Sequence, residues 1–315
     1  MKKIKVLNTV NFSGCEDSIE RLSKIAIVKS VKPQRKEVLK IIENYHIYFS
    51  SLSFRFDKEI IDKAKNLKLV VSPSTGTDHI DKEYLLSKGI ELFDLSKEFE
   101  VINSFTATSE LAFTLLLNVN RKIFQAVNST KNNEWGREQF TGYQLLNKTF
   151  GIIGMGRLGT ISARIAKGFG MKVIYNDIKK INSNLGSQVD LETLCKESDY
   201  ISLHVHLTNK TKNLINLRHF NLMKKNAIVI NTSRAALINE KDLLKSLLDK
   251  KIMGAGLDMI DGEWISNKID HPLMKYSVEN ENLIITPHIG GCTFESIYGA
   301  RIFMAKKIYD YIKSL

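Results

Sequence analysis

A strand, a glycine-rich turn and a helix follow one another in the middle of the chain, and this order constrains the fold most. The apolar run Phe150–Ile153 leads into Gly154, and Gly156 and Gly159 follow with G-x-G-x-x-G spacing. The first glycine permits a tight turn, the second lets the backbone approach a pyrophosphate, and the third lets the helix pack on the strand. Asp177 ends the next expected strand. We therefore expect a dinucleotide-binding βαβ unit with phosphates at the helix N-terminus.

Strand and helix patterns alternate along most of the chain, which is typical of parallel sheets covered by helices on both faces. Short helices are expected between the early strands, a long one begins near Ser109, and the last 23 residues form another. The later strands suffice for one complete dinucleotide-binding domain. The expected strands are Ile4–Leu7, Ile25–Val28, His46–Phe49, Leu67–Val71, Ile90–Phe93, Phe150–Ile153, Val173–Asn176, Tyr200–Val205, Ala227–Asn231, Gly254–Leu257 and Leu283–Thr286.

The size and composition of the chain exclude several classes of protein. With 315 residues, of which 43% are apolar, about two globular domains are expected. No segment approaches the roughly 18 consecutive apolar residues of a membrane span, and the N-terminus lacks a secretory pattern. The three cysteines are far apart, so neither a disulfide framework nor a metal site is expected. We expect a cytoplasmic protein.

The charge balance is strongly basic, with a formal net charge of +12. Basic domains often bind nucleic acid. Here, however, the excess is mostly lysine, it is spread along the chain, and no basic run is interleaved with aromatic residues. This pattern argues against a nucleic-acid interface and favours a compositional bias that also attracts anionic ligands.

Three polar residues of the last third come after expected strands and suggest chemistry. Arg234 and His288 come just after two strands, and Glu263 lies in the loop after a third. Open α/β sheets bind ligands at this carboxyl edge. A guanidinium can grip a carboxylate or carbonyl with two hydrogen bonds, and an imidazole can transfer a proton near neutral pH. A carboxylate beside that imidazole would keep it protonated for the reduction of a keto acid.

Each of these residues, taken alone, also has a simpler interpretation. Arg234 could form a surface ion pair, Glu263 could be solvated, and His288 could cap a turn after its proline. The functional interpretation depends on all three sharing one edge of the sheet with the glycine turn.

Several segments together resemble the D-isomer-specific 2-hydroxyacid dehydrogenases, phosphoglycerate dehydrogenases and hydroxypyruvate or glyoxylate reductases among them. The resemblance covers nearly the whole chain and is strongest from Asn147 to Thr293. Motifs in the family's order make it more specific than the glycine turn alone. They are Gly154–Gly159, Ser202–Thr208, Met223–Arg234, Gly254–Asp258 and Thr286–Gly291.

The resemblance implies a set of site residues. The family's catalytic Arg, Glu and His fall on Arg234, Glu263 and His288, and Asp258 matches the acid that contacts the nicotinamide end of the cofactor. The substrate carboxylate would be held by backbone N–H groups of the loop Ser74, Thr75 and Gly76. The expected cofactor contacts are Gly154, Gly156, Arg157, Leu158, Gly159, Asp177, Thr208, Thr232, Ser233, Asp258, Gly290 and Gly291.

The resemblance also implies two doubly wound parallel-sheet domains, with a Rossmann-type cofactor domain inserted into a flavodoxin-like substrate domain. Residues 1–101 with 290–315 would form the substrate domain, and residues 102–289 would form the NAD-binding domain. A cleft between them would close over the substrate and exclude water. Family members are usually homodimers joined through the cofactor domains, so a homodimer is expected.

The cofactor choice depends on Asp177, because a carboxylate there can accept hydrogen bonds from the ribose diol and would repel a 2′-phosphate. NAD is therefore favoured over NADP, although Lys179 and Lys180 could soften the repulsion. The chain departs from the family's usual residues at Ala235, His206, Trp264 and Cys292. If the φ angle at Ala235 were positive, its Cβ would shift the turn after Arg234.

The expected activity is hydride transfer between NAD(H) and a small 2-hydroxy acid/2-keto acid pair. The last motif most resembles phosphoglycerate dehydrogenases, but Ser51-Leu52 stands where those enzymes commonly carry Arg-Ser. Losing that Arg would weaken phosphate binding, with Arg55 as a possible substitute. Two alternatives stay open. One is a same-scaffold enzyme for phosphite or formate, and the other is a non-catalytic NAD-sensing protein of the corepressor type.

Overall fold

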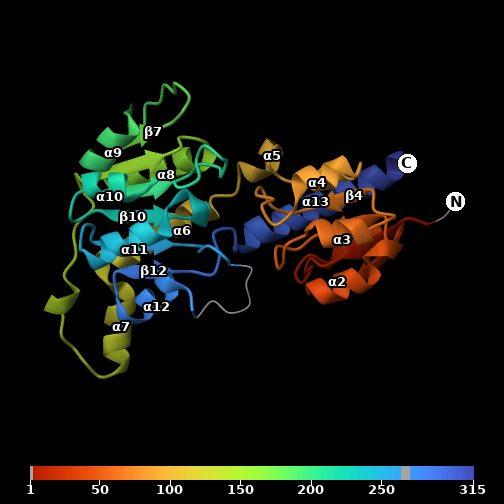
Figure 1. Ribbon diagram of the computed structural model, residues 1–315, viewed down its shortest axis with the longest axis horizontal. Coiled ribbons are helices and arrows are strands. Elements are labelled where there is room, and N and C mark those ends of the chain that lie inside the picture. The colour runs from red at the N-terminus through yellow and green to blue at the C-terminus, as the bar shows by residue number, and fades with distance from the viewer. Residues whose placement is uncertain (1–2, 264–269) are drawn as a thin grey trace. The chain divides into compact units, whose positions relative to one another are not determined.

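The computed structural model describes residues 3–263 and 270–315 (Figure 1). Internal contacts divide the chain into unit 1, Met1–Phe105 with Cys292–Leu315, and unit 2, Thr106–Gly291. Each unit has its own parallel sheet and its own core. The chain leaves unit 1, forms unit 2 and returns, so the expected class of two doubly wound parallel-sheet domains, one inserted into the other, is confirmed.

The sheet of unit 1 has the strand order β2-β1-β3-β4-β5, and all its pairings are parallel. This 2-1-3-4-5 order is that of flavodoxin-like folds. Its strands are β1 (Lys5–Asn8), β2 (Ile27–Ser30), β3 (Ile47–Phe49), β4 (Leu69–Val71) and β5 (Glu91–Phe93).

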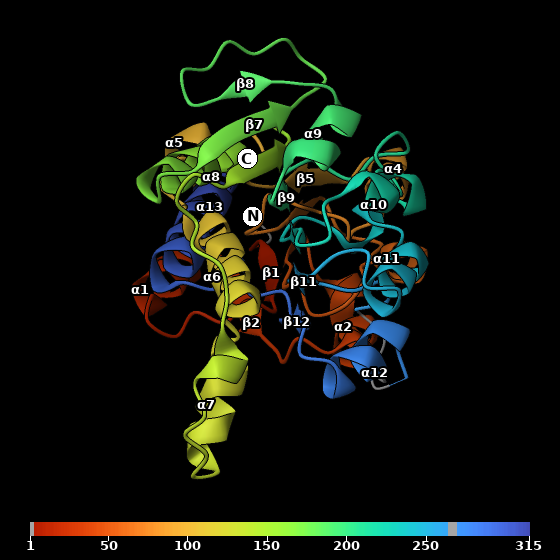
Figure 2. The ribbon, with the colours of Figure 1, turned by 90° about the vertical axis from the view of Figure 1, so that its left-hand side faces the viewer.

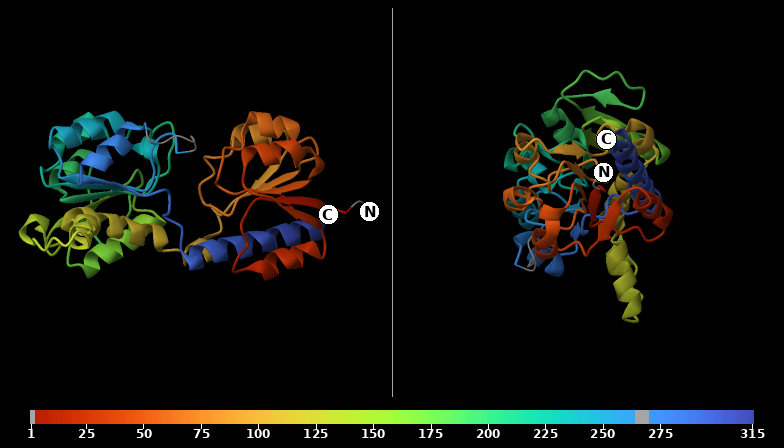
Figure 3. Two further views of the ribbon diagram at one scale, coloured as in Figure 1. Left: turned by 90° about the horizontal axis from the view of Figure 1, so that it is seen from below. Right: turned by 90° about the vertical axis from the view of Figure 1, so that its right-hand side faces the viewer.

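Helices cover both faces of this sheet, because successive residues of each strand point to opposite sides. In β1, Val6 packs in the core shared with α1, α5 and α13, and Leu7 packs in the core shared with α2, α3 and α4. Figure 3 shows the long α13 lying along one face. The helices are α1 (Glu16–Ser23), α2 (Arg35–Ile41), α3 (Lys58–Lys63), α4 (Lys82–Ser87), α5 (Phe99–Ile102) and α13 (Phe294–Ser314).

The sheet of unit 2 is also entirely parallel, with the order β12-β11-β10-β9-β6-β7-β8. Numbered within the unit, this order is 7-6-5-4-1-2-3. Strands are added toward one side of the sheet from β6 to β8 and toward the other side from β9 onward, so the order switches between β6 and β9. Ligands of doubly wound sheets bind at such a switch point. The strands are β6 (Thr149–Ile153), β7 (Lys172–Asn176), β8 (Ser187–Gln188), β9 (Tyr200–Leu203), β10 (Ile228–Asn231), β11 (Gly254–Leu257) and β12 (Leu283–Ile285).

Two helices, α6 and α8, pack on one face of this sheet, and α9 to α12 pack on the other. Ile228 and Ile230 point toward α6 and α8, while Val229 between them points to the opposite core. Helix α7 extends away from the sheet (Figure 2). The helices are α6 (Ala107–Arg121), α7 (Ile123–Lys131), α8 (Arg157–Gly168), α9 (Leu191–Glu197), α10 (Leu217–Leu222), α11 (Glu240–Leu248) and α12 (Pro272–Glu279).

Some elements differ from the sequence-based expectation. The short strand β8 was not expected, and β9 ends at Leu203 rather than Val205. The sequence patterns gave no residue ranges for helices α1, α5, α7, α9, α10 and α12. The long helix near Ser109 ends at Arg121, because Lys122 adopts a left-handed conformation with φ of 49° before α7 begins. Among the described residues, no helix combines the length and the apolar character needed to cross a membrane.

Candidate active site

The three glycines of the turn after β6 differ in why the fold needs glycine at each position. Gly154 has a φ of +96°, and a Cβ there would lie 2.8 Å from the carbonyl oxygen of His204. A Cβ on Gly159 would lie only 2.1 Å from the carbonyl oxygen of Gly154, so α8 can approach the strand only with glycine. A Cβ on Gly156, by contrast, would meet no atom of the described residues within 4 Å. Protein packing therefore explains Gly154 and Gly159, and it leaves open space at Gly156.

The carboxylate of Asp177, which comes after β7, lies against this turn. Its Oδ2 accepts the backbone N–H of Met155 at 2.9 Å, and its Oδ1 accepts that of Lys179 at 2.9 Å. The side chain is half-buried. Asp177 thus holds the glycine turn and keeps a negative charge beside it.

Two buried polar atoms lie at the carboxyl ends of the neighbouring strands β9 and β10, of which β9 borders the switch point. The Oγ1 of Thr232 and the Nδ1 of His204 have no hydrogen-bond partner within the described part of the chain. The other ring nitrogen of His204 shares a hydrogen bond of 2.9 Å with Ser202 Oγ, and burial lowers the pKa of His204 to about 4. Unpartnered polar groups are costly inside a protein, so a polar ligand at this edge would satisfy them.

These observations fit a dinucleotide. The open space at Gly156, the N-terminus of α8, and the unpartnered atoms of Thr232 and His204 all belong to the same stretch of the sheet edge. Helix N-termini favour phosphate groups, because their first N–H groups lack partners within the helix.

Arg234 lies in a turn that is held by the side chain of Asn231 at the end of β10. The amide of Asn231 accepts the N–H of Ser233 at 3.0 Å and donates to the carbonyl of Arg234 at 2.8 Å. Ser233 Oγ donates to the carbonyl of Leu203 on β9, at 2.7 Å. Ala235 is not among the residues with positive φ, so its Cβ does not strain this turn.

The turn that carries His288 is organised by the fully buried Asp258, which comes after β11. One carboxylate oxygen accepts from Thr286 Oγ1 at 2.7 Å and from the N–H of Ile289 at 2.8 Å, and the other accepts from the N–H of Gly290 at 2.7 Å. Burial raises the pKa of Asp258, and these hydrogen bonds oppose that rise. His288 itself has a left-handed φ of 55°.

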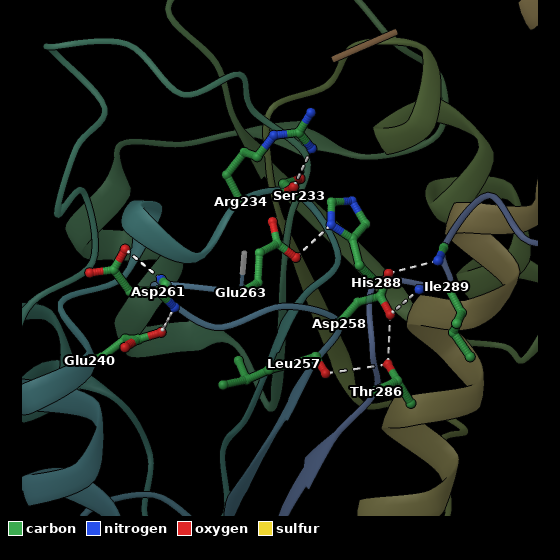
Figure 4. Close-up of polar contacts among 12 residues, drawn as sticks. Ser233, Arg234, Glu240, Leu257, Asp258, Asp261, Glu263, Thr286, His288 and Ile289 are labelled. Carbon is green, nitrogen blue, oxygen red and sulfur yellow. Dashed lines mark hydrogen bonds and ion pairs between the residues drawn. The ribbon is translucent and has the colours of Figure 1, made fainter. Parts of the chain in front are cut away.

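The structure brings the imidazole of His288 and the carboxylate of Glu263 into contact. The distance from Nδ1 of His288 to Oε2 of Glu263 is 2.8 Å, and the two side chains are 31% and 23% exposed. Figure 4 shows Arg234, Glu263 and His288 gathered in one region of the sheet edge. With Nδ1 donating to the carboxylate, Nε2 is the ring nitrogen that a proton-transfer role would use.

The beginning of α6 connects the glycine helix with the turn of His288. Thr108 Oγ1 donates to the carbonyl of Gly290 at 3.1 Å, and Ser109 Oγ donates to the carbonyl of Leu158 in α8 at 3.0 Å. Sequence analysis missed both residues and also Asn231, because a hydroxyl or amide that binds a distant carbonyl leaves no local pattern. Their position beside recognised motifs is the only signal that the sequence offers.

The remaining expected residues lie in both units. Thr208 is exposed and pairs with Thr211, and Gly290 packs so tightly that a Cβ would lie 2.9 Å from Asp258 Oδ2. In unit 1, Ser74 Oγ donates to the carbonyl of Gly76 at 2.7 Å within the loop after β4. Trp264 lies outside the described residues.

Comparison with known proteins assigns the chain to a family. Residues 6–112 match the catalytic domain of the D-isomer specific 2-hydroxyacid dehydrogenases, and residues 113–290 match their NAD binding domain. The chain therefore belongs to this family. It is an NAD-dependent oxidoreductase that acts on a 2-hydroxy acid/2-keto acid pair, and NAD is its cofactor.

Individual relatives cover nearly the whole chain. It is 36% identical to a glyoxylate reductase of Thermococcus litoralis, over 94% of this chain and 89% of that protein. It is 35% identical to a hydroxypyruvate reductase of Thermotoga maritima, over 90% of each. A crystal structure of D-lactate dehydrogenase from Aquifex aeolicus, complexed with NAD and lactic acid, is similar with a TM-score of 0.84 and 26% identity, covering 98% of this chain and 96% of that one.

Proposed function

We propose that the protein reduces a small, unphosphorylated 2-keto acid such as glyoxylate or hydroxypyruvate, with Arg234 binding the substrate and His288 supplying the proton. The observation that carries this proposal is the 2.8 Å contact between His288 Nδ1 and Glu263 Oε2, at the sheet edge that also presents Arg234. The names of the glyoxylate and hydroxypyruvate reductases to which the chain is similar support the choice of substrates.

In this mechanism the guanidinium of Arg234 grips the carboxylate and carbonyl oxygens of the keto acid and orients the carbonyl carbon. NADH, when bound, supplies the hydride that adds to that carbon. His288 donates its Nε2 proton to the oxygen on which negative charge develops, and Glu263 holds the Nδ1 proton and stabilises the imidazolium before the transfer. For oxidation of the hydroxy acid, His288 accepts the same proton.

We further propose that NAD is held by the glycine turn, by Asp177 at the ribose, and by the edge residues named above. Arg157 and Leu158 at the start of α8, Thr208, Thr232, Ser233 and Asp258, and the pair Gly290 and Gly291 complete the set. Asp177 favours NAD over NADP, because its carboxylate can bind a ribose diol and would repel a phosphate.

The preference for an unphosphorylated substrate is supported by unit 1. The loop after β3 carries Ser51, whose N–H donates to Thr9 Oγ1 at 3.0 Å, and Leu52, which is 44% exposed. Hydroxyls and an apolar side chain offer no charge to a phosphate, which proteins usually bind with Arg, Lys or helix N-termini. We propose that backbone N–H groups of Ser74, Thr75 and Gly76 bind the substrate carboxylate.

The test is a substrate panel. NADH absorbance is followed with glyoxylate, hydroxypyruvate, pyruvate, longer 2-keto acids and phosphohydroxypyruvate, and repeated with NADPH. We expect the highest kcat/KM for glyoxylate or hydroxypyruvate with NADH. Binding of NADH without turnover on any keto acid would contradict the proposal and favour a sensing role, and preference for phosphohydroxypyruvate would overturn the substrate class.

We also propose that the protein is a homodimer joined through unit 2. Large apolar side chains are exposed on α7, in the segment between α7 and β6, and at the end of α8, and burying them against a second copy would remove them from water. They are Ile123, Phe124, Val127, Trp135, Leu146 and Phe169. Analytical ultracentrifugation should show a dimer for the native chain and a monomer for Phe124→Glu. A monomeric native chain would contradict this proposal.

A cytoplasmic location stays a prediction.

A further inference from the structure

The carboxylate of Glu240, the first residue of α11, contacts the backbone of Asp261 and the side chain of His271, which are both distant from it in sequence. Its Oε1 accepts the N–H of Asp261 at 2.8 Å, and its Oε2 lies 3.0 Å from Nε2 of His271 (Figure 4 shows the first contact). The side chains of Glu240 and His271 are only 17% and 18% exposed. Burial raises the pKa of Glu240, and the contacts with Asp261 and His271 oppose that rise.

His271 is fixed on its other side as well. Its Nδ1 accepts the N–H of Leu273 at 3.3 Å and so caps the beginning of α12. Because Nδ1 is an acceptor, the ring proton of neutral His271 is on Nε2, where it points to Glu240. The imidazole therefore links the start of α12 to the carboxylate of α11.

The first contact of Glu240 fixes the start of the segment that carries Glu263. Asp261 is two residues before Glu263, and His271 is the last residue before α12. Buried residues precede this segment, since Met259 and Ile260 are 3% and 4% exposed. The carboxylate of Glu240 thus fixes the backbone at Asp261, two residues from Glu263, and Glu263 itself reaches His288.

We propose that Glu240, together with His271, is a positioning residue that holds Glu263 against His288. This inference rests on the proposed acid–base role of His288. Glu240 does not touch substrate or cofactor in this proposal, and it acts only by fixing the backbone on which Glu263 is carried. Small displacements of a catalytic group are costly, because a shift of about 1 Å can reduce a rate by roughly 10²-fold.

The test is a double-mutant cycle with Glu240→Gln and Glu263→Ala, measured as kcat and KM for the best keto acid of the panel. Gln keeps the size of Glu240, but the Asp261 N–H and the His271 Nε2–H are both donors. The single oxygen of Gln can accept from only one of them, and its NH2 group faces the other donor, so the two-point contact is lost. We expect kcat to fall by about 10-fold in Glu240→Gln, within the range of such displacements. In the Glu263→Ala background the same change should have almost no effect, because the two residues act as a unit.

The controls separate positioning from general damage. Glu279→Gln makes the same change of charge at the exposed end of α12 and should leave kcat unchanged. His271→Asn can still cap α12, since Asn is a favoured cap, but it is too short to reach Glu240, so it should reproduce the loss. His271→Asn also carries the test if Glu240→Gln does not fold. An equal loss of kcat in both backgrounds, or no loss with Glu263 present, would overturn the inference.

A second measurement does not depend on activity. In crystal structures of the variants, we expect Glu263 to leave hydrogen-bond range of His288 in Glu240→Gln and to keep the contact in Glu279→Gln. An intact contact in Glu240→Gln would refute the inference even if the enzyme reduces keto acids. Absence of turnover in the native protein would refute the proposed function, and the crystal structures would still decide the role of Glu240.

Discussion

The two sheets of the molecule share one architecture but differ in the residues that lie beyond their strands. In unit 1, the central strands β1, β3 and β4 lead into the small hydroxyl residues Thr9, Ser50 and Ser72. In unit 2, the same edge carries the glycine turn, buried or half-buried carboxylates, Arg234 and His288. The parallel sheet is thus a common support, and the chemistry depends on the residues placed at its carboxyl edge.

The comparison also shows how many supporting hydrogen bonds hold an ionisable side chain in place at the sheet edge. In unit 1, Ser50 and Ser72 are satisfied by near neighbours in the chain, as in the 2.8 Å contact between Ser72 Oγ and Ser74 Oγ, and Thr9 pairs with Tyr48 on the adjacent strand β3. In unit 2, the turn of His288 requires three hydrogen bonds to the buried carboxylate of Asp258 and a further one from Thr108. Positioning the imidazole of His288 therefore involves residues from widely separated parts of unit 2.

The largest expected effect is a loss of kcat when His288 of unit 2 is replaced, compared with Ser74 of unit 1. His288→Ala should lower kcat by about 10²–10⁴, the usual contribution of a general acid–base group. Ser74→Ala in unit 1 should mainly raise KM, because Ser74 only supports its loop through the carbonyl of Gly76. Steady-state kinetics of both variants test this difference, with His219→Ala as a control in unit 2. Unchanged kcat in His288→Ala, or an equal loss in Ser74→Ala, would contradict the division of roles.

The next effect concerns acid stability and should come from His204. Its pKa is about 4 in the folded protein and 6.5 ordinarily, so between these values only the unfolded chain binds the proton. The contribution of neutral His204 to the free energy of unfolding is therefore complete above pH 6.5. It is lost as the pH falls toward 4, and the loss is up to about 3 kcal/mol.

This effect can be measured by urea unfolding at about pH 7 and pH 4.5. His204→Asn should show a smaller loss of stability on acidification than the native chain, while the exposed His206→Asn should behave as the native chain does. An equal loss of unfolding free energy between about pH 7 and pH 4.5 in the native chain and in His204→Asn would show that His204 titrates normally in the folded protein.

The smallest effect distinguishes two glycines of the same turn. Gly159→Ala forces a Cβ against the carbonyl of Gly154 and should destabilise the fold by about 1–3 kcal/mol. Gly156→Ala meets no described atom within 4 Å, so it should leave the fold intact and weaken NADH binding by about 10-fold, or 1.4 kcal/mol. Urea unfolding and NADH fluorescence titration measure the two quantities. An NADH affinity equal to that of the native chain in Gly156→Ala would show that the pyrophosphate does not lie against Gly156.

Sequence patterns were sufficient for parallel sheets covered by helices and for every described strand except β8, because buried parallel strands are short apolar runs bounded by turn residues. The insertion of one domain into the other was implied only by the family resemblance. Sequence patterns were insufficient where a single backbone conformation decides the element. Lys122 adopts a left-handed conformation that lysine rarely takes, so nothing in the sequence indicates that the long helix ends there. The strand β8 has only two residues and no apolar pattern of its own.

The candidate site was predicted where its residues lie in motifs and missed where they act from elsewhere. Arg234 and His288 were found because each lies just beyond a strand. Glu240 and Thr108 were missed, because each acts through a contact with a residue distant in sequence. Such contacts depend on tertiary packing, and a single sequence carries no periodic signal for them.

The left-handed backbone of His288 has a consequence for attempts to make the protein more robust. A φ of 55° costs an ordinary residue about 1 kcal/mol, while glycine or asparagine adopts it easily. Replacing His288 by either residue would relieve this backbone and abolish the proposed proton transfer. A screen for thermostable variants that ignored turnover would therefore favour an inert protein at this position, so selection for heat resistance should always retain an assay of catalysis.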